Sequence, residues 1–183
     1  AKTINLGLFY GMGKAKLQAE LGVSKDKAEE LFAIYHQRVP FVKTLMKSVS
    51  NRAQQRGQIR TLLGRLCRFH LWEPNRFGIN KALPFEQAVQ EHGQGNIRRA
   101  YTYKALNKLI QGSAADMTKK SMLDLYKEGI IAHIQIHDEL DLSVESPEQA
   151  KKVVEIMENA VKLDVPNKVD YESGKNWGDI YDK

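Results

Sequence analysis

Apolar residues recur every three to four positions over the first 57 residues of the chain, which is the period of an α-helix with one buried face. This pattern predicts a helix over residues 1–21 that is interrupted near Gly11, because glycine weakens a helix interior. Lys2, Leu6 and Tyr10 lie four residues apart and therefore share one face if that helix is regular. The first segment is thus predicted to present a basic, an aliphatic and an aromatic side chain together.

Two further helices are predicted from the residues at their ends. Ser24 is a suitable N-cap for a helix that runs to about Arg38. Pro40 suits the first turn of the next helix, and Gly57 is well placed to end it. We interpret both helices as scaffold, with their charged residues on solvated faces.

A basic hairpin is predicted next, over Ile59–Phe69, because Gly64 and Arg65 suit a turn between two short strands. Five arginines lie within or just before it: Arg52, Arg56, Arg60, Arg65 and Arg68. Such arginines suit contact with phosphate groups, although a solvated charged hairpin explains them nearly as well. Residues 70–96 are broken by proline and glycine and are predicted as a loop that contains one short helix.

The longest helix is predicted over Ile97–Lys127. Its buried side is expected to consist of apolar residues at helical spacing: Ala105, Leu109, Ala114, Met117, Met122 and Leu125. Asn107 and Gln111 are four residues apart and share a face. The small residues at 112–115 would allow another backbone or a nucleic-acid duplex to approach closely. Asp116 is interpreted as a structural residue rather than as a metal ligand.

A period of two, typical of half-buried strands, appears in residues 131–144. Ile134 and Ile136 alternate with polar residues before the middle of this stretch, and apolar residues alternate again after it: Leu140, Leu142 and Val144. The pattern predicts a hairpin with His137, Asp138 and Glu139 at its tip. Adjacent carboxylates suit a hard divalent cation such as Mg²⁺, and a solvated acidic turn is the alternative interpretation.

The final part of the chain is predicted as a helix and one strand. Ser146 and Pro147 open the helix, which runs to about Lys162, and Val169–Glu172 supplies the strand. Strands are few and are joined by hairpins or helices. We therefore expect an α+β fold with a small, mostly antiparallel sheet and helices packed on one face.

Composition bounds the class of protein without deciding it. With 42% hydrophobic and 27% charged residues, the 183-residue chain suits one or two ordinary globular domains. The formal net charge of +6 is compatible with a polyanionic partner. The single cysteine, Cys67, excludes an internal disulfide and suits a reducing cytoplasm. No apolar run is long enough for a membrane span.

Four segments in order resemble family A DNA polymerases, the DNA polymerase I type. These segments are AKTINLGLFYGMG, IQGSAAD, QIHDELDL and ESGKNWGDIY. The resemblance implies fingers helices over residues 1–57 and a palm portion over residues 58–183, with the basic hairpin and a loop insertion at 58–96. It also implies template-directed DNA synthesis, in which two Mg²⁺ ions assist transfer of a nucleotide from a dNTP to the primer 3′-hydroxyl.

The resemblance also implies roles for individual residues at the nucleotide. Lys2 would contact the triphosphate and take part in catalysis, Leu6 would lie beside the base and sugar, and Tyr10 would lie at the templating position. Asp138 would be the metal ligand and a catalytic residue, with Glu139 in support. Relatives usually carry Phe or Tyr where this chain has Leu6, so the resemblance leaves its sugar selection open.

Contacts with primer-template DNA are implied at four further positions: Asn107, Gln111, His137 and Arg65. Asn107 and Gln111 would read the minor groove near the primer end, where acceptors occur at every base pair. The second catalytic aspartate of the family belongs to an earlier motif. We therefore expect this chain to be a C-terminal fragment that needs an N-terminal polymerase portion, is inactive alone, and acts in a bacterial or phage-infected cell.

Two other functions remain compatible with these residues. One is a non-catalytic DNA-binding module that keeps the polymerase fold, and the other is a fragment of a single-subunit RNA polymerase. Retention of residues with different chemical roles argues against the first. The QGSAAD and HDE motifs together favour a DNA enzyme over the second.

Overall fold

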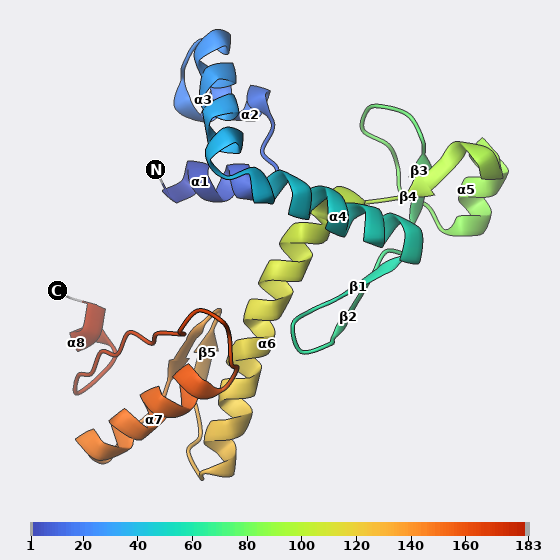
Figure 1. Ribbon diagram of the computed structural model, residues 1–183. Coiled ribbons are helices and arrows are strands. Elements are labelled where there is room, and N and C mark those ends of the chain that lie inside the picture. The colour runs from blue at the N-terminus through green and yellow to red at the C-terminus, as the bar shows by residue number, and fades with distance from the viewer. Residues whose placement is uncertain (1, 182–183) are drawn as a thin grey trace. The chain divides into compact units, whose positions relative to one another are not determined.

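A computed structural model describes residues 2–181, with side chains described for residues 4–180 (Figure 1). The chain divides into two compact units, Ala1–Gly112 and Ser113–Lys183, which are described separately below. The predicted boundary between fingers and palm at residue 57 is a division by function, whereas the two units are a division by compactness. The boundary at residue 57 therefore stays a prediction. Among the described residues, no helix has both the length and the apolar character needed to cross a membrane.

The first unit begins with four helices: α1 (Lys2–Phe9), α2 (Lys14–Leu21), α3 (Lys25–Arg38) and α4 (Pro40–Arg56). The predicted interruption near Gly11 is confirmed. The Ser24 hydroxyl accepts a hydrogen bond from the Lys27 amide at 3.3 Å, as expected of an N-cap. Gly57 ends α4 in the left-handed region, with φ 66°. Within α3, burial raises the pKa of Tyr35.

The predicted basic hairpin is confirmed as β1 (Gln58–Arg60) and β2 (Leu66–Arg68), with Ile59 opposite Cys67. A second antiparallel pair, β3 (Trp72–Pro74) and β4 (Ile97–Arg99), encloses the segment expected to be a loop. That segment contains the predicted short helix, α5 (Phe85–His92), which lies beside β3 and β4 (Figure 1). Two short 3₁₀ turns, Gln94–Asn96 and Thr102–Lys104, flank β4.

The longest helix, α6, spans Ala105–Lys127, so the predicted start at Ile97 is wrong. Residues 97–99 form a strand instead, because tertiary contacts fix them. Arg99 donates hydrogen bonds to the Gln54 carbonyl at 3.2 Å and the Phe69 carbonyl at 2.9 Å. Its guanidinium also lies 4.5 Å from the centre of the Trp72 ring, a cation–π distance. Tyr101 then adopts φ 61°, which separates this strand from the helix.

The core of the first unit joins α4, the hairpin and the start of α6. Its buried members share an apolar character: Val49, Ala53, Ile59, Phe69, Ala105 and Leu106. Burial of each larger side chain in this core stabilises the folded state by about 1.5–3 kcal/mol. The same packing fixes the β1–β2 hairpin against α6, which is the element that carries Asn107 and Gln111.

The second unit contains the rest of α6 and the elements β5 (Ile134–Ile136), β6 (Glu139–Asp141), α7 (Pro147–Asn159) and α8 (Gly178–Tyr181). Its core is built on Leu125, Ile130 and Val153, with several half-buried side chains packed against them: Leu140, Leu142, Val144, Ile156 and Met157. Ser146 caps α7 by accepting from the Gln149 amide at 3.2 Å. The predicted helix is confirmed but ends at Asn159, before Lys162.

Two expectations for the second unit are wrong. Val169–Glu172 is not a strand, since the Val169 amide donates to the Glu158 carboxylate at 3.2 Å rather than to a neighbouring strand. Ile134 and Ile136 were expected to be half-buried, yet they are exposed. The described strands form three separate antiparallel pairs, and the predicted α+β class is confirmed.

Candidate functional site

The tip of the β5–β6 hairpin carries the acidic residues that the sequence singles out. Ile136 pairs with Glu139, so His137 and Asp138 form the two-residue turn between the strands. His137 adopts φ 52°, which is uncommon outside glycine and costs about 1 kcal/mol or more. The side-chain amide of Gln135 donates a hydrogen bond to the His137 carbonyl at 2.6 Å and holds this turn. The turn therefore places Asp138 at the outermost point of the hairpin.

The two faces of this hairpin differ in character. Leu140 and Leu142 lie on the face that packs against the core of the second unit. Side chains alternate along a strand and directly paired residues share a face. Glu139 and Asp141 therefore lie on the opposite face, together with their partners Ile136 and Ile134. The hairpin is thus anchored on one face, while Asp138 at its tip and Glu139 beside it are exposed.

The carboxylates fit part of a Mg²⁺ site. Asp138 is exposed, and among the residues the structure describes it makes no ion pair. One Asp141 carboxylate oxygen is buried without a hydrogen-bond partner among the described residues, so this oxygen is not open to a metal ion from solvent. No group of three or more potential metal-ligating side chains occurs in the described part of the chain. Magnesium is often held by one or two carboxylates plus substrate phosphates, and this hairpin fits that mode.

In the first unit, the predicted nucleotide-binding residues lie on or just after α1. Leu6 is 46% exposed, and Tyr10 is half-buried immediately beyond the end of the helix. The side chain of Lys2 lies outside the described residues, so its predicted role stays a prediction. The exposed aliphatic surface of Leu6 is compatible with contact to a ligand.

A hydrogen bond joins two predicted site residues that are 101 positions apart in the chain. The Gln111 side-chain amide donates to the Tyr10 hydroxyl at 2.9 Å. Asn107 lies one turn before Gln111 on α6 and is exposed. Sequence periodicity places Asn107 and Gln111 on one face, but it carries no signal for the contact with Tyr10. The structure therefore brings a predicted nucleotide residue and a predicted DNA residue together.

The turn of the β1–β2 hairpin packs on the same part of α6. Arg65 donates from Nη2 to the Gly112 carbonyl at 2.8 Å. A Cβ atom at Gly112 would lie 2.9 Å from Thr61 Cγ2, which is too close for an unstrained contact. Glycine at this position thus permits the close approach of the hairpin. Arg65 is engaged in this structural contact, and its role toward DNA stays a prediction.

Comparisons with known proteins agree over nearly the whole chain. The sequence pattern of DNA polymerase family A matches residues 1–179. A DNA-directed DNA polymerase of Pseudomonas phage M6 is 33% identical over 97% of this chain and 29% of its own length. DNA polymerase I of Bacillus caldotenax is 36% identical over 98% of this chain and 19% of its own length.

A solved structure of a DNA polymerase domain resembles the fold of this chain. The POL domain of Pol1 from M. smegmatis, in complex with DNA primer-template and dNTP, matches with a TM-score of 0.68 and 29% identity. The match covers 90% of this chain and 28% of that one. The chain therefore spans less than a third of the relatives named here. From its sequence and its fold, the chain belongs to DNA polymerase family A.

Proposed function

We propose that this chain forms part of a template-directed DNA polymerase and carries one catalytic carboxylate together with a nucleotide-binding surface. The observation that carries the proposal is Asp138 at the exposed tip of an anchored hairpin, within a chain that matches the family almost from end to end. The relatives named above are DNA polymerases, which favours DNA over RNA as the product.

The proposed reaction is attack of a primer 3′-hydroxyl on the α-phosphate of a dNTP, with release of pyrophosphate. Asp138 would hold Mg²⁺, which when bound activates the hydroxyl and neutralises charge on the phosphates. Glu139 would add negative charge beside that ligand. Lys2 would attract the triphosphate, because a lysine ammonium is a compact positive charge.

The remaining site residues would position the substrates. Leu6 would lie beside the sugar and base of the dNTP, and Tyr10 would offer a ring near the templating base. Asn107 and Gln111 would contact the minor groove, while His137 shapes the hairpin tip and Arg65 lies near the duplex. The proposed partners are primer-template DNA, dNTPs and a polymerase portion that carries the second catalytic aspartate, in the cytoplasm of a bacterial or phage-infected cell.

A chimaeric polymerase tests this function. In it, the present chain replaces the matching segment of the Bacillus caldotenax enzyme. Extension of a labelled primer by the chimaera with the four dNTPs would support the proposal. A folded chimaera that binds primer-template but adds no nucleotide would contradict it.

Leu6→Phe in the chimaera is expected to change the ratio of dideoxynucleotide to deoxynucleotide incorporation by about tenfold or more. The reason is that one side chain in contact with a substrate group typically changes discrimination by this factor. Competition between a ddNTP and the matching dNTP measures the ratio. Leu123→Phe, at an exposed leucine of α6, is the control and should leave it unchanged. An unchanged ratio for both Leu6→Phe and Leu6→Tyr would mean that this position does not contact the sugar.

Gln111→Ala in the chimaera is expected to slow extension from a matched primer by about three- to tenfold, the range for loss of one or two hydrogen bonds. It should also change extension past a mismatch near the primer end. Tyr10→Phe is a matched control, because it removes only the hydroxyl that accepts from Gln111. If the two variants behave alike, Gln111 acts by positioning Tyr10. If Gln111→Ala leaves both rates unaltered, the proposed minor-groove contact is wrong.

A further inference from the structure

The loop between β3 and the α5 region presents two large apolar side chains to solvent. Phe77 and Ile79 have relative exposures of 106% and 108%. Single exposed apolar residues are ordinary, but two within three residues at the tip of one loop form a small apolar contact surface. We refer to residues 75–82 as the β3 loop.

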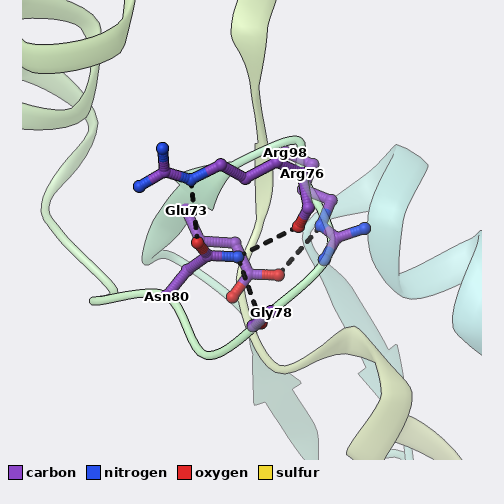
Figure 2. Close-up of polar contacts among 5 residues, drawn as sticks. All are labelled: Glu73, Arg76, Gly78, Asn80 and Arg98. Carbon is purple, nitrogen blue, oxygen red and sulfur yellow. Dashed lines mark hydrogen bonds and ion pairs between the residues drawn. The ribbon is translucent and has the colours of Figure 1, made fainter.

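The β3 loop is held by hydrogen bonds at its base (Figure 2). The side-chain nitrogen of Asn80 donates to the Arg76 carbonyl at 3.1 Å and to the Gly78 carbonyl at 3.3 Å. The side-chain oxygen of Asn80 accepts a hydrogen bond from Arg76 Nε at 3.3 Å. Gly78 has φ +126°, a conformation that favours glycine. Asn80 therefore closes a turn whose outer residues are Phe77 and Ile79.

A polar pocket of about 340 Å³ lies at the foot of this turn. It is lined by Pro74, Asn75, Arg76, His92, Gly95 and Asn96. Arginine, histidine and two asparagines supply hydrogen-bond donors, the lining that suits a phosphate group. One acidic side chain lies next to a lining residue: the Glu91 carboxylate is 3.8 Å from His92 Nε2.

The charge around the pocket also favours an anion. Glu73 lies at the base of the loop, and Arg98 neutralises it through a 2.9 Å ion pair across the β3–β4 ladder (Figure 2). In the part of the chain that the structure describes, Arg76 has no acidic partner. Its Nε is used by Asn80, so its terminal nitrogens are the donors that can serve a ligand. Lys81, within the β3 loop, adds a further positive charge.

We propose that the β3 loop is a binding site for single-stranded nucleic acid, outside the nucleotidyl-transfer site. Phe77 stacks on an unpaired base, Ile79 packs against its sugar, and the pocket at Arg76 and His92 takes a neighbouring phosphate. Aromatic stacking beside a basic groove is the usual way of binding single strands without sequence preference. A two-residue apolar tip is also far smaller than the surface of a stable protein–protein interface. The identity of the strand as DNA rests on the proposed function.

Binding of a fluorescein-labelled oligothymidine to the full 183-residue chain, followed by fluorescence anisotropy at low salt, tests the site. Phe77→Ala should weaken binding by about fivefold or more, the loss expected for one stacked base, and Phe77→Trp should retain it. Phe41→Ala is the matched control, since Phe41 is a 59% exposed phenylalanine on α4. Because the Phe77 side chain is fully exposed, these substitutions should leave the fold intact, and circular dichroism checks this.

Arg76→Gln supplies an independent measurement. It should reduce the slope of log affinity against log salt by about 0.7, the value for one phosphate contact on a single strand. Equal binding by wild type and Phe77→Ala would overturn the proposal, and would leave a protein partner as the better explanation of the exposed tip. Tighter binding of duplex than of single strand, with equal loss in Phe77→Ala, would also overturn it. Failure of the chimaera to extend a primer contradicts the polymerase function alone, because oligothymidine binding requires no catalysis.

Discussion

Asp138→Asn in the chimaeric polymerase is expected to lower primer extension by about two to three orders of magnitude, while the affinity for primer-template changes by less than about twofold. The substitution keeps the size of the side chain and removes its negative charge. Electrostatic groups that stabilise a transition state are usually worth this much. Asp138 lies in an exposed turn, so its loss should cost little stability.

Single-turnover extension across a Mg²⁺ titration measures this effect. The half-saturating Mg²⁺ concentration should rise in the variant, a change that a purely structural role would not produce. Asp164→Asn is the control, because Asp164 is also an exposed aspartate of the second unit and has no assigned role. Near-normal extension by Asp138→Asn would remove this carboxylate from the mechanism and leave the hairpin tip as a solvated acidic turn.

Features set by neighbouring residues were predictable from the sequence. The caps at Ser24, Gly57 and Ser146 fixed helix ends because each depends on a side chain or a backbone angle within one turn of the helix. The hairpin tip at Asp138 followed from strand alternation on either side of it. Local chemistry thus located most helices and the acidic turn.

Features set by distant residues were not predictable. The β3–β4 pair depends on Glu73 meeting Arg98 and on Arg99 bonding to carbonyls 30 and 45 residues away. The helix-like spacing after Ile97 gave no sign of these contacts, and tertiary bonding overrode it. The hydrogen bond from Gln111 to Tyr10 is of the same kind. Ile134 and Ile136 show a second limit of local patterns. Their alternation with polar residues correctly indicated a strand, but it did not reveal that both side chains are exposed.

The residues with proposed roles are divided between the two compact units. The nucleotide face on α1 and the contact between Tyr10 and Gln111 belong to the first unit, whereas Asp138 belongs to the second. Each unit has a core of its own. A substitution at Leu6 or Gln111 should therefore alter substrate selection without disturbing the hairpin that carries Asp138.

The 183-residue chain by itself is expected to give no primer extension above background with either Mg²⁺ or Mn²⁺. Two-metal transfer requires ligands that hold a pair of ions about 3.5–4 Å apart, and the hairpin supplies only part of such a set. Among the described residues, no third potential ligand lies close enough to complete a metal site with Asp138 and Glu139. The resemblance to the family assigns the second catalytic aspartate to a different motif. Primer extension by the purified chain, measured beside the chimaera at equal concentration, tests this expectation.

The same purified chain should still bind DNA, and its affinity should fall steeply with salt. Scattered arginine and lysine contacts to phosphate release counterions, so log affinity decreases linearly with log salt concentration. A salt series with a labelled primer-template shows that the protein is folded and competent to bind when extension is absent. Robust extension by the chain alone, abolished by Asp138→Asn, would mean that the second carboxylate lies within these 183 residues. Asp141, with its unpaired buried oxygen on the same face as Glu139, would then be the first residue to substitute.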